Sequence, residues 1–421
     1  MARTQKRTRT GKLPTDLILP RDGRKPQVAG RCLIRLLEDQ LRCLRAQPVH
    51  GNRKLLADHV LVAHLIAFFN PAIASLRTVE DVFNHDDVRR RMRLPRVPKS
   101  TLADAQHAFD ISLLQPLVED LASRLDLSQN PNLDAVTRQI VAVDATVFQV
   151  AGRIAWALPH NSTSDRGAMQ MCLHLDVVHG VPLGFTIIGG NESERKELPA
   201  ALESNRLYLL DRAYQSYAAL DRIAEIDSDF VVRLRHTAKF DVQERLPLSA
   251  DDRRAGAVRD AIVVPSGRSR SFAMPVRLVE IVARAETEGR TPGRQGSDEP
   301  VRLLTNRLDL PADLIGLLYR HRWQIELFFR WLKCVTDMRH FLSESPNGMA
   351  LQLYVAMIGT LLIALETGSK PSKYDFAQMS LVASGMVTLE QAKAVMAKRR
   401  AERARAAAQQ AAYRARKKTS R

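Results

Sequence analysis

The sequence predicts an α/β fold in which an all-helical N-terminal segment precedes a mixed sheet and a β-rich insertion interrupts that sheet. Three observations support it. Apolar residues recur at helical spacing from 33 to about 125, short β-rich runs alternate with helical segments from 139 to 235, and further β-rich runs fill 236–305. A chain of 421 residues with 45% hydrophobic content can bury a large core, and this length suggests two or three domains.

The N-terminal part, residues 1–130, is expected to be a helical nucleic-acid-binding domain with a basic arm. Two of its apolar segments, 59–69 and 110–125, have clear helical spacing. A basic stretch lies ahead of a helix start at which Thr101 and Asp104 have capping-box spacing. This stretch suits phosphate contact, although an ordinary exposed loop explains it equally well. Its candidate DNA-binding residues are Arg89, Arg90, Arg91 and Arg93.

The next part, residues 135–235, is expected to be the first half of the mixed sheet. Its order is strand, strand, strand, helix, strand, helix, strand, with His179-Gly180 as the turn of a hairpin. Two short strands stop at carboxylates, the first at Asp144 and the second at Asp211. Sites in α/β sheets form at the C-terminal ends of strands, so both residues are candidates for chemistry. Each alone is also explained as a turn former or a helix cap.

Residues 236–308 are expected to form the β-rich insertion, with strands near 260–265, 272–283 and 300–306. The helical pattern resumes at Pro311, and residues 309–370 are expected to complete the sheet domain with a helix that carries a glutamate. The apolar run 349–365 is short of the ~20 residues that span a bilayer, so we expect a buried core helix and no membrane partner.

Most of the positive charge lies at the two ends of the chain. The net charge is +17; residues 1–12 hold five Lys/Arg and no acid, and residues 391–421 hold eleven Lys/Arg with Glu402 as their one acid. The body between them is nearly neutral. This pattern favours nucleic-acid-binding arms over a basic catalytic core. Residues 371–421 are therefore interpreted as a linker and a basic tail, either helical on nucleic acid or simply solvated.

The cysteines fit a reducing cytosol. They are widely spaced, with no CxxC pair and no His/Cys cluster of zinc spacing. The first twelve residues lack the apolar region of a secretory signal. The four cysteines are Cys32, Cys43, Cys172 and Cys334.

Four polar residues share one side of an otherwise apolar helix. At about 100° per residue, Tyr319, Arg322, Glu326 and Lys333 fall within an arc of roughly 60°. Apolar side chains occupy much of the remaining surface, which predicts a buried helix. Charges on a buried helix are costly unless they pair or meet a ligand or metal, so the stripe predicts the wall of a site. An ion-pair ladder at i,i+4 spacing is the structural alternative.

Two aspartates at strand ends and a glutamate on a buried helix are the ingredients of a two-metal site. Hard cations such as Mg²⁺ take oxygen ligands, and two ions roughly 3.5–4 Å apart hold the attacking and leaving oxygens of a phosphodiester. Arg322 and Lys333 would then face phosphates, and Tyr319 would bond the nucleic-acid backbone. The sequence contains no P-loop, no Gly-x-Ser-x-Gly elbow and no histidine pair at ligand spacing.

These residues together resemble the DDE transposases of the IS-four group. The fingerprint Tyr-x2-Arg-x3-Glu-x6-Lys is complete in YRHRWQIELFFRWLK, the first aspartate matches in VAVDATVF, and the second matches in LLDRAY. In the last motif Asp211, Arg212 and Tyr214 follow the pattern Asp-Arg-x-Tyr. The resemblance covers most of residues 90–366.

The resemblance implies an RNase H-like catalytic core in which Asp144, Asp211 and Glu326 bind two Mg²⁺ ions, with Mn²⁺ as an alternative. Asp144 would bridge both metals, and the other two carboxylates would complete one site each. It also implies that Tyr319, Arg322, Lys333 and Arg212 position DNA. The family cuts transposon ends by metal-activated water and then uses the freed 3′-hydroxyl to attack target DNA.

The implied partners are double-stranded DNA, as terminal inverted repeats and as target, and a second copy in a homodimeric synaptic complex. The implied location is the bacterial cytoplasm, in association with the nucleoid. One departure concerns hairpin formation, for which some members use a Trp in the insertion: this chain has Trp156, Trp323 and Trp331, none of them there. The alternatives are a domesticated, non-catalytic DNA-binding transposase and an RNase H-like nuclease that does not transfer strands.

Overall fold

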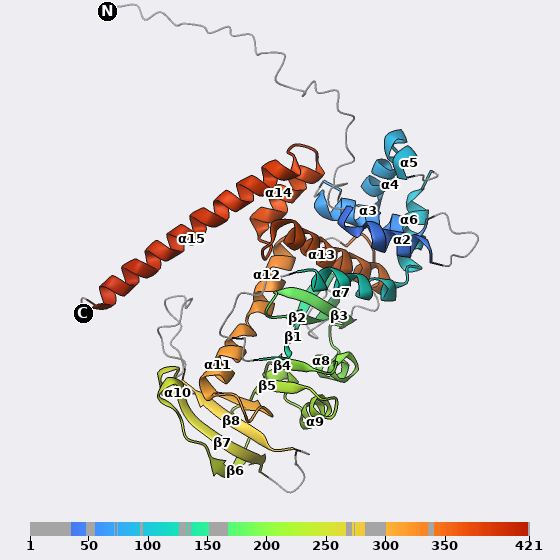
Figure 1. The fold of residues 1–421 in the computed structure, drawn as a ribbon. Helices are drawn as coiled ribbons and strands as arrows, with labels where there is room; N and C mark the ends of the chain where they lie inside the picture. Colours follow the sequence, from blue (N-terminus) through green and yellow to red (C-terminus); the bar gives the residue numbers. More distant parts are fainter. Residues whose placement is uncertain are drawn as a thin grey trace, which may run out of the picture.

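The protein is seen in a computed structural model, which shows a large mixed sheet with helices on both faces (Figure 1). The described residues form nine strands in the order β3-β2-β1-β4-β5-β9-β8-β7-β6. The predicted α/β class is confirmed. The structure describes residues 35–47, 55–70, 72–73, 75–92, 96–125, 133, 136–150, 167–266, 272, 274–282, 300–335 and 341–419.

The first five strands follow the predicted order along the chain. β1, β2 and β3 form an antiparallel meander, and β4 and β5 run parallel to β1. Gly180 closes the β2–β3 hairpin with φ +68, a left-handed conformation that suits glycine. The elements are β1 (Gln139–Val150), β2 (Gly167–Asp176), β3 (Val181–Gly189), α8 (Glu194–Glu197), η5 (Leu198–Ala201), β4 (Arg206–Leu210), η6 (Arg212–Tyr214), α9 (Tyr217–Glu225) and β5 (Asp229–Arg233).

The insertion strands extend this sheet instead of forming a sheet of their own. β9 pairs antiparallel with β5 on one side and with β8 on the other. The three expected strands are present, but β6 was not expected, because its side chains are mostly exposed and follow no apolar alternation. These elements are β6 (Phe240–Arg245), α10 (Ala250–Arg254), β7 (Ala257–Pro265), β8 (Val276–Ile281) and β9 (Val301–Thr305).

A buried ion pair ties the insertion to the helix that follows it. Arg277 on β8 donates to both carboxylate oxygens of Asp260 on β7, at 2.7 and 2.5 Å, and both side chains are almost fully buried. The same guanidinium donates to the carbonyl of Leu310, just before α11 (Ala312–His321). A bidentate pair of this kind fixes geometry as well as charge. The start of α11 is therefore held against the sheet.

The N-terminal helices pack onto the later part of the chain. Their buried side chains belong to one continuous hydrophobic cluster with α13 (Pro346–Thr367), so they have no separate core. The described residues of this range are helical, and the all-helical N-terminal domain at residues 1–130 stays a prediction. The helices are η2 (Arg35–Leu37), α2 (Glu38–Arg45), α3 (Ala57–Phe69), α4 (Leu76–Asn84), α5 (Asp86–Met92), α6 (Lys99–His107), η3 (Ile111–Leu113) and α7 (Gln115–Ser123).

The expected capping box at Thr101 is wrong. Helix α6 begins at Lys99, and its N-cap is Pro98, three residues before Thr101, with no side-chain cap. Pro98 lies just outside the helix with φ −75 and ψ 156, an extended conformation that the proline ring allows. Part of the basic stretch is also helical, since α5 covers residues 86–92.

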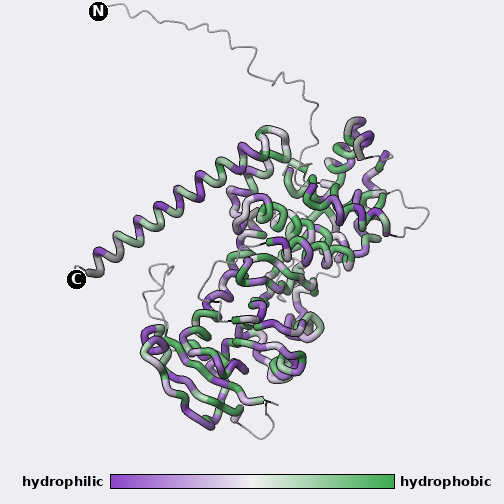
Figure 2. The backbone as a smooth tube through the Cα atoms, in the orientation of Figure 1, coloured by the Kyte–Doolittle hydropathy of each residue, from purple (hydrophilic) through white to green (hydrophobic). Residues whose placement is uncertain are grey.

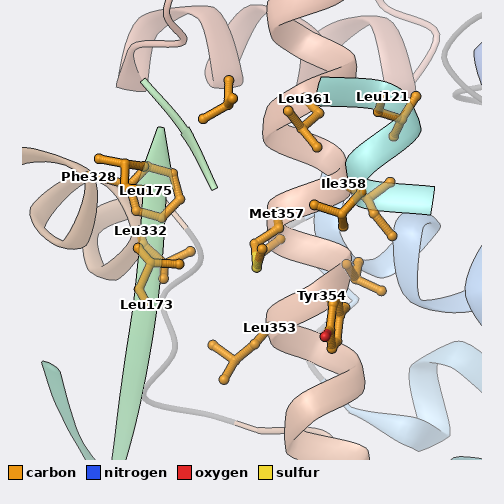
Figure 3. Close-up of a cluster of buried hydrophobic side chains, with 14 of the residues drawn as sticks. Leu121, Leu173, Leu175, Phe328, Leu332, Leu353, Tyr354, Met357, Ile358 and Leu361 are labelled. Carbon is orange, nitrogen blue, oxygen red and sulfur yellow. The ribbon is translucent and has the colours of Figure 1, made fainter. Parts of the chain in front are cut away.

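Helix α13 is the centre of the core. It is almost entirely buried, and its side chains meet β2 and α12 (Gln324–Val335) on one side and α7 on the other (Figure 3). By length and a mean hydropathy of 2.0 it could cross a membrane, but 83% of that window is buried inside the fold. The region that α13 occupies in Figure 1 is mostly hydrophobic in Figure 2. The predicted core helix is confirmed.

The linker predicted at the start of residues 371–421 is wrong for most of its length. Residues Lys373–Ala383 form α14, which is capped by reciprocal bonds between Ser372 and Asp375 and buries Phe376 and Met379. The polar residues that suggested a linker belong largely to this N-terminal cap and to the exposed face of α14. A long helix, α15 (Leu389–Thr419), follows and runs away from the body (Figure 1).

Candidate functional site

Strand alternation places both aspartates on the same face of the sheet. In β1, Ile140 and Ala142 belong to the cluster around α13, whereas Val141 and Val143 belong to the cluster on the opposite face. Successive side chains alternate, so Asp144 follows Ala142 toward the α13 side. The same parity in β4, where Leu207 and Leu209 face α13, carries Asp211 to that side.

The expectation that β1 stops at Asp144 is wrong, but its consequence holds. β1 continues to Val150 because its antiparallel pairing with β2 continues. Its parallel pairing with β4 stops at Val143 and Leu210. The next residues in register are Asp144 and Asp211, and both lie directly after the last β1–β4 backbone pair. Asp211 directly follows β4, as predicted, and is the N-cap of η6.

The expected single helix is two helices joined by a tight turn. α11 ends at His321 and α12 begins at Gln324. At the turn the N–H groups of Arg322 and Ile325 donate to carbonyls three residues back, instead of four. The expected burial on most sides is also wrong, because Trp323 is 49% and Leu327 41% exposed. Tyr319, Arg322, Glu326 and Lys333 therefore lie on a pair of helices, α11 and α12, that has one side exposed to solvent.

Arg322 joins the stripe to the sheet. Its Nη1 lies 3.3 Å from Oδ2 of Asp144, and its Nη2 lies 2.6 Å from Oε1 of Glu326. Arg322 is buried, with 8% exposure. One turn earlier, the hydroxyl of Tyr319 donates to Oδ1 of Asp211 at 3.1 Å. The structure therefore brings five sequence-predicted residues into one site, from β1, the end of β4, α11, the turn and α12.

The site carries more negative than positive charge. Burial raises the pKa of Asp144 to about 6; Arg322 and the N–H of Ala145 oppose the rise, while Asp211 and Glu326 add to it. Burial alone would lower the pKa of Arg322, but Tyr319 and the carboxylates together raise it. The guanidinium of Arg322 thus offsets only part of the cost of burying the ionised Asp144 carboxylate.

Other predicted site residues lie outside this cluster. Lys333 is exposed, with its ammonium 5.3 Å from the ring centroid of Phe148. Arg212 is exposed beside Asp211. Among the basic residues of α5, Arg89 pairs with Asp86 at 3.7 Å and Arg90 donates to the Asp86 carbonyl. The Arg91 side chain and Arg93 lie outside the described residues.

Sequence reasoning missed Glu194, on the short helix α8. Burial raises its pKa, and the charges of Asp144 and Asp211 raise it further, so its carboxylate belongs to the same electrostatic group. α8 packs against η6, where the buried Tyr214 lies beside this carboxylate. The hydroxyl of Tyr214 has no hydrogen-bond partner within normal distance among the described residues. A helix of four residues has no apolar period, so no local pattern marked Glu194.

The donor set suits a hard divalent cation. Asp144, Asp211 and Glu326 offer carboxylate oxygens, which Mg²⁺ and Mn²⁺ prefer as ligands. Within the described ranges no three acidic, His or Cys side chains converge closely enough to hold an ion as they stand. Instead the guanidinium of Arg322 lies between Asp144 and Glu326. Burial keeps the pKa of Asp144 raised in spite of this guanidinium, so a bound cation would stabilise the ionised carboxylate.

Comparison with known proteins gives the family. The model described as Transposase DDE domain matches residues 136–362, more than half of the chain. The chain belongs to the DDE transposase family. The matched range holds every residue of the site described above. The predicted resemblance to DDE transposases is confirmed, and the protein is a DNA transposase, a metal-dependent enzyme of DNA cleavage and transfer.

Relatives of this transposase include proteins of two bacteria. A Sinorhizobium fredii protein named as a transposase, y4zB, is 28% identical over 63% of this chain and 70% of its own length. A Geobacillus stearothermophilus protein named as the transposase of insertion sequence element IS5377 is 21% identical over 71% of this chain and 74% of its own length. A solved piggyBac transposase synaptic complex with hairpin DNA covers 83% of this chain and 76% of its own at 10% identity, and its TM-score of 0.35 is too low to support the fold.

The transposase should become more stable when Asp144 is replaced by Asn. Because the pKa of Asp144 is raised, ionising it costs the fold free energy as pH rises from about 4 to 6, and the full cost remains above pH 6. Asp144→Asn should therefore raise the free energy of unfolding at pH 8, without divalent cation, by on the order of 1–3 kcal/mol. At pH 5, between the unfolded and the folded pKa, the gain should be about half as large.

The measurement is denaturant unfolding at both pH values. Asp104→Asn is the matched control, because Asp104 is an exposed aspartate on α6. A loss of stability at pH 8 in Asp144→Asn would contradict the electrostatic description of the site.

Proposed function

We propose that the transposase uses an RNase H-like core in which Asp144, Asp211 and Glu326 hold two Mg²⁺ ions, with Mn²⁺ as the alternative metal. The observation that carries the proposal is the pair of bonds from Arg322 to Asp144 and Glu326, beside Asp211 at the adjoining register position. The antiparallel meander β1–β3, with β4 and β5 parallel to β1, supports the RNase H-like core. The complete Tyr-Arg-Glu-Lys fingerprint supports the IS-four group.

The proposed reaction cleaves the ends of a transposon and joins the freed 3′-hydroxyl to target DNA. Bound divalent cations would stabilise the attacking and leaving oxygens of the phosphodiester. The residues of this chain would bind the cations and hold the ligands in place. Asp144, Asp211 and Glu326 would provide the anionic oxygens, and Tyr319 would hold Asp211 in place through the 3.1 Å bond. Glu194 would add negative charge from α8.

Arg322 would have two roles. Without cations it balances the carboxylates, as its contacts to Asp144 and Glu326 indicate. Cations that take over this balance would leave its guanidinium free to bind a phosphate, for which its planar donors are suited. Lys333 and Arg212, both exposed near this edge of the sheet, would contact DNA farther from the reacting phosphate.

The proposed partners follow from this reaction. Double-stranded DNA would bind as terminal inverted repeats and as target, and two copies of the chain would hold two ends in a synaptic complex. The basic residues of α5 would contribute phosphate contacts. The reaction would take place in the bacterial cytoplasm, at the nucleoid.

Replacement of any one metal-binding carboxylate should abolish cleavage without abolishing DNA binding. Asp144→Asn, Asp211→Asn and Glu326→Gln should each lower the rate of strand cleavage by at least about 10²-fold, because each removes an anionic ligand. The substrate is a duplex carrying the inverted repeat that flanks the gene, and binding is measured by mobility shift. Asp104→Asn is the exposed control.

The products of the same assay separate the alternatives. Joined strands support a transposase, cleavage without joining supports a nuclease, and binding without either supports a domesticated protein. Undiminished cleavage by any of the three carboxylate variants would contradict the assigned roles.

Glu194→Gln should weaken cation binding without abolishing cleavage. Loss of one nearby negative charge lowers the attraction for Mg²⁺, so the Mg²⁺ concentration that gives half of the thermal stabilisation should rise about 3- to 10-fold. Glu192→Gln is the matched control, because Glu192 is exposed two residues away. Equal Mg²⁺ dependence in both variants would show that Glu194 takes no part in the site.

A further inference from the structure

Helix α15 has two parts: residues 389–400, here called the root, contact the body of the protein, and residues 401–419, here called the free half, extend beyond it. In the root, Ala392 and Met396 are buried. Lys393 pairs with Glu366 at 3.0 Å, and Arg400 pairs with Asp375 at 3.3 Å, and both acidic side chains are largely buried. The guanidinium of Arg399 lies 4.2 Å from the ring centroid of Tyr374. These contacts fix the direction in which the helix leaves the body.

The free half begins at Ala401. Every residue from 401 to 413 is exposed, and the helix continues to Thr419. At 1.5 Å per residue this half is about 28 Å long. Figure 1 shows it pointing away from the rest of the chain, and Figure 2 shows hydrophilic positions recurring along it.

The free half is strongly basic. Between 401 and 419 the sequence has six Lys/Arg against Glu402. In the part of the helix that the structure describes, Arg403, Arg405 and Arg416 have no acidic partner, in contrast to Lys393 and Arg400 in the root. At about 100° per residue the six cations spread over roughly 220° of the helix circumference. Within the described residues, the charges of Arg403, Arg405 and Arg416 are therefore not neutralised by an ion pair.

The side chains of the free half argue against an apolar partner. Its remaining surface is mostly alanine, and Tyr413 is the one large apolar side chain among its described exposed residues. Such a surface buries too little apolar area for a helix–helix dimer or for membrane insertion. A second copy of the helix would also bring like charges together.

We propose that residues 401–419 are an arm that binds the phosphate backbone of duplex DNA without reading its sequence. This rests on the proposed transposase function. A slim, alanine-rich helix fits a major groove about 12 Å wide, and cations over a wide arc can reach phosphates of both strands. The root lies close to the site, since α14 packs against both α15 and the Glu326 helix α12. The arm would therefore hold the same DNA that enters the site.

The test measures the salt dependence of DNA binding. In the full chain, Arg403, Arg405 and Arg416 are replaced together by Gln, which keeps helix propensity, and the matched control carries Lys at the same positions. Binding to the terminal duplex and to an unrelated duplex is followed by fluorescence anisotropy between about 50 and 200 mM salt. The slope of log K against log salt should become shallower by as much as about 3 in the Gln variant, on both duplexes, and stay unchanged in the Lys variant.

Cleavage at saturating protein should remain in the Gln variant, which separates this proposal from the transposase assignment. A second variant that ends at Arg400 keeps the anchored root and loses seven Lys/Arg, so its slope should fall further. Unchanged slopes in both variants would overturn the proposal. So would a shift from dimer to monomer in sedimentation with an unchanged slope, which would assign the helix to a second copy.

Discussion

The architecture of the site depends on the balance of charge around one buried guanidinium. Arg322 bonds Asp144 from the sheet and Glu326 from α12, and an unpaired charge at this depth would cost several kcal/mol. The pair of bonds therefore fixes the turn between α11 and α12 against β1. The same bonds do not fully offset the burial of Asp144, whose pKa stays raised. The contacts of Arg322 thus position α11 and α12, and the incomplete offset at Asp144 favours the binding of a cation.

The rest of the fold keeps these groups in register. The Arg277–Asp260 pair and the Leu310 carbonyl hold the start of α11, and α13 fills the space behind α12 and β2. The insertion contributes to this support because its strands continue the core sheet through β9. Phosphoryl transfer requires groups held within narrow limits, and a site supported from two sides meets that requirement.

Much of the site could be predicted because its signals are local. The spacing of Tyr319, Arg322 and Glu326 and the two aspartates beside short strands are periodic patterns within single segments. The break at Arg322 could not be predicted, since it accompanies pairing with Asp144, far away in the chain. Glu194 reaches the site through sheet topology alone. The β5–β9 pairing and the burial of α14 likewise depend on tertiary contacts, which the sequence pattern does not carry.

Calorimetric titration of Mg²⁺ into the wild type and into Arg322→Gln tests the central claim most directly. If the guanidinium occupies the place of a cation between Asp144 and Glu326, its removal should free both carboxylates. The variant should then bind Mg²⁺ about 10-fold more tightly or better, a gain of at least about 1.4 kcal/mol. Equal or weaker Mg²⁺ binding by Arg322→Gln would contradict the account.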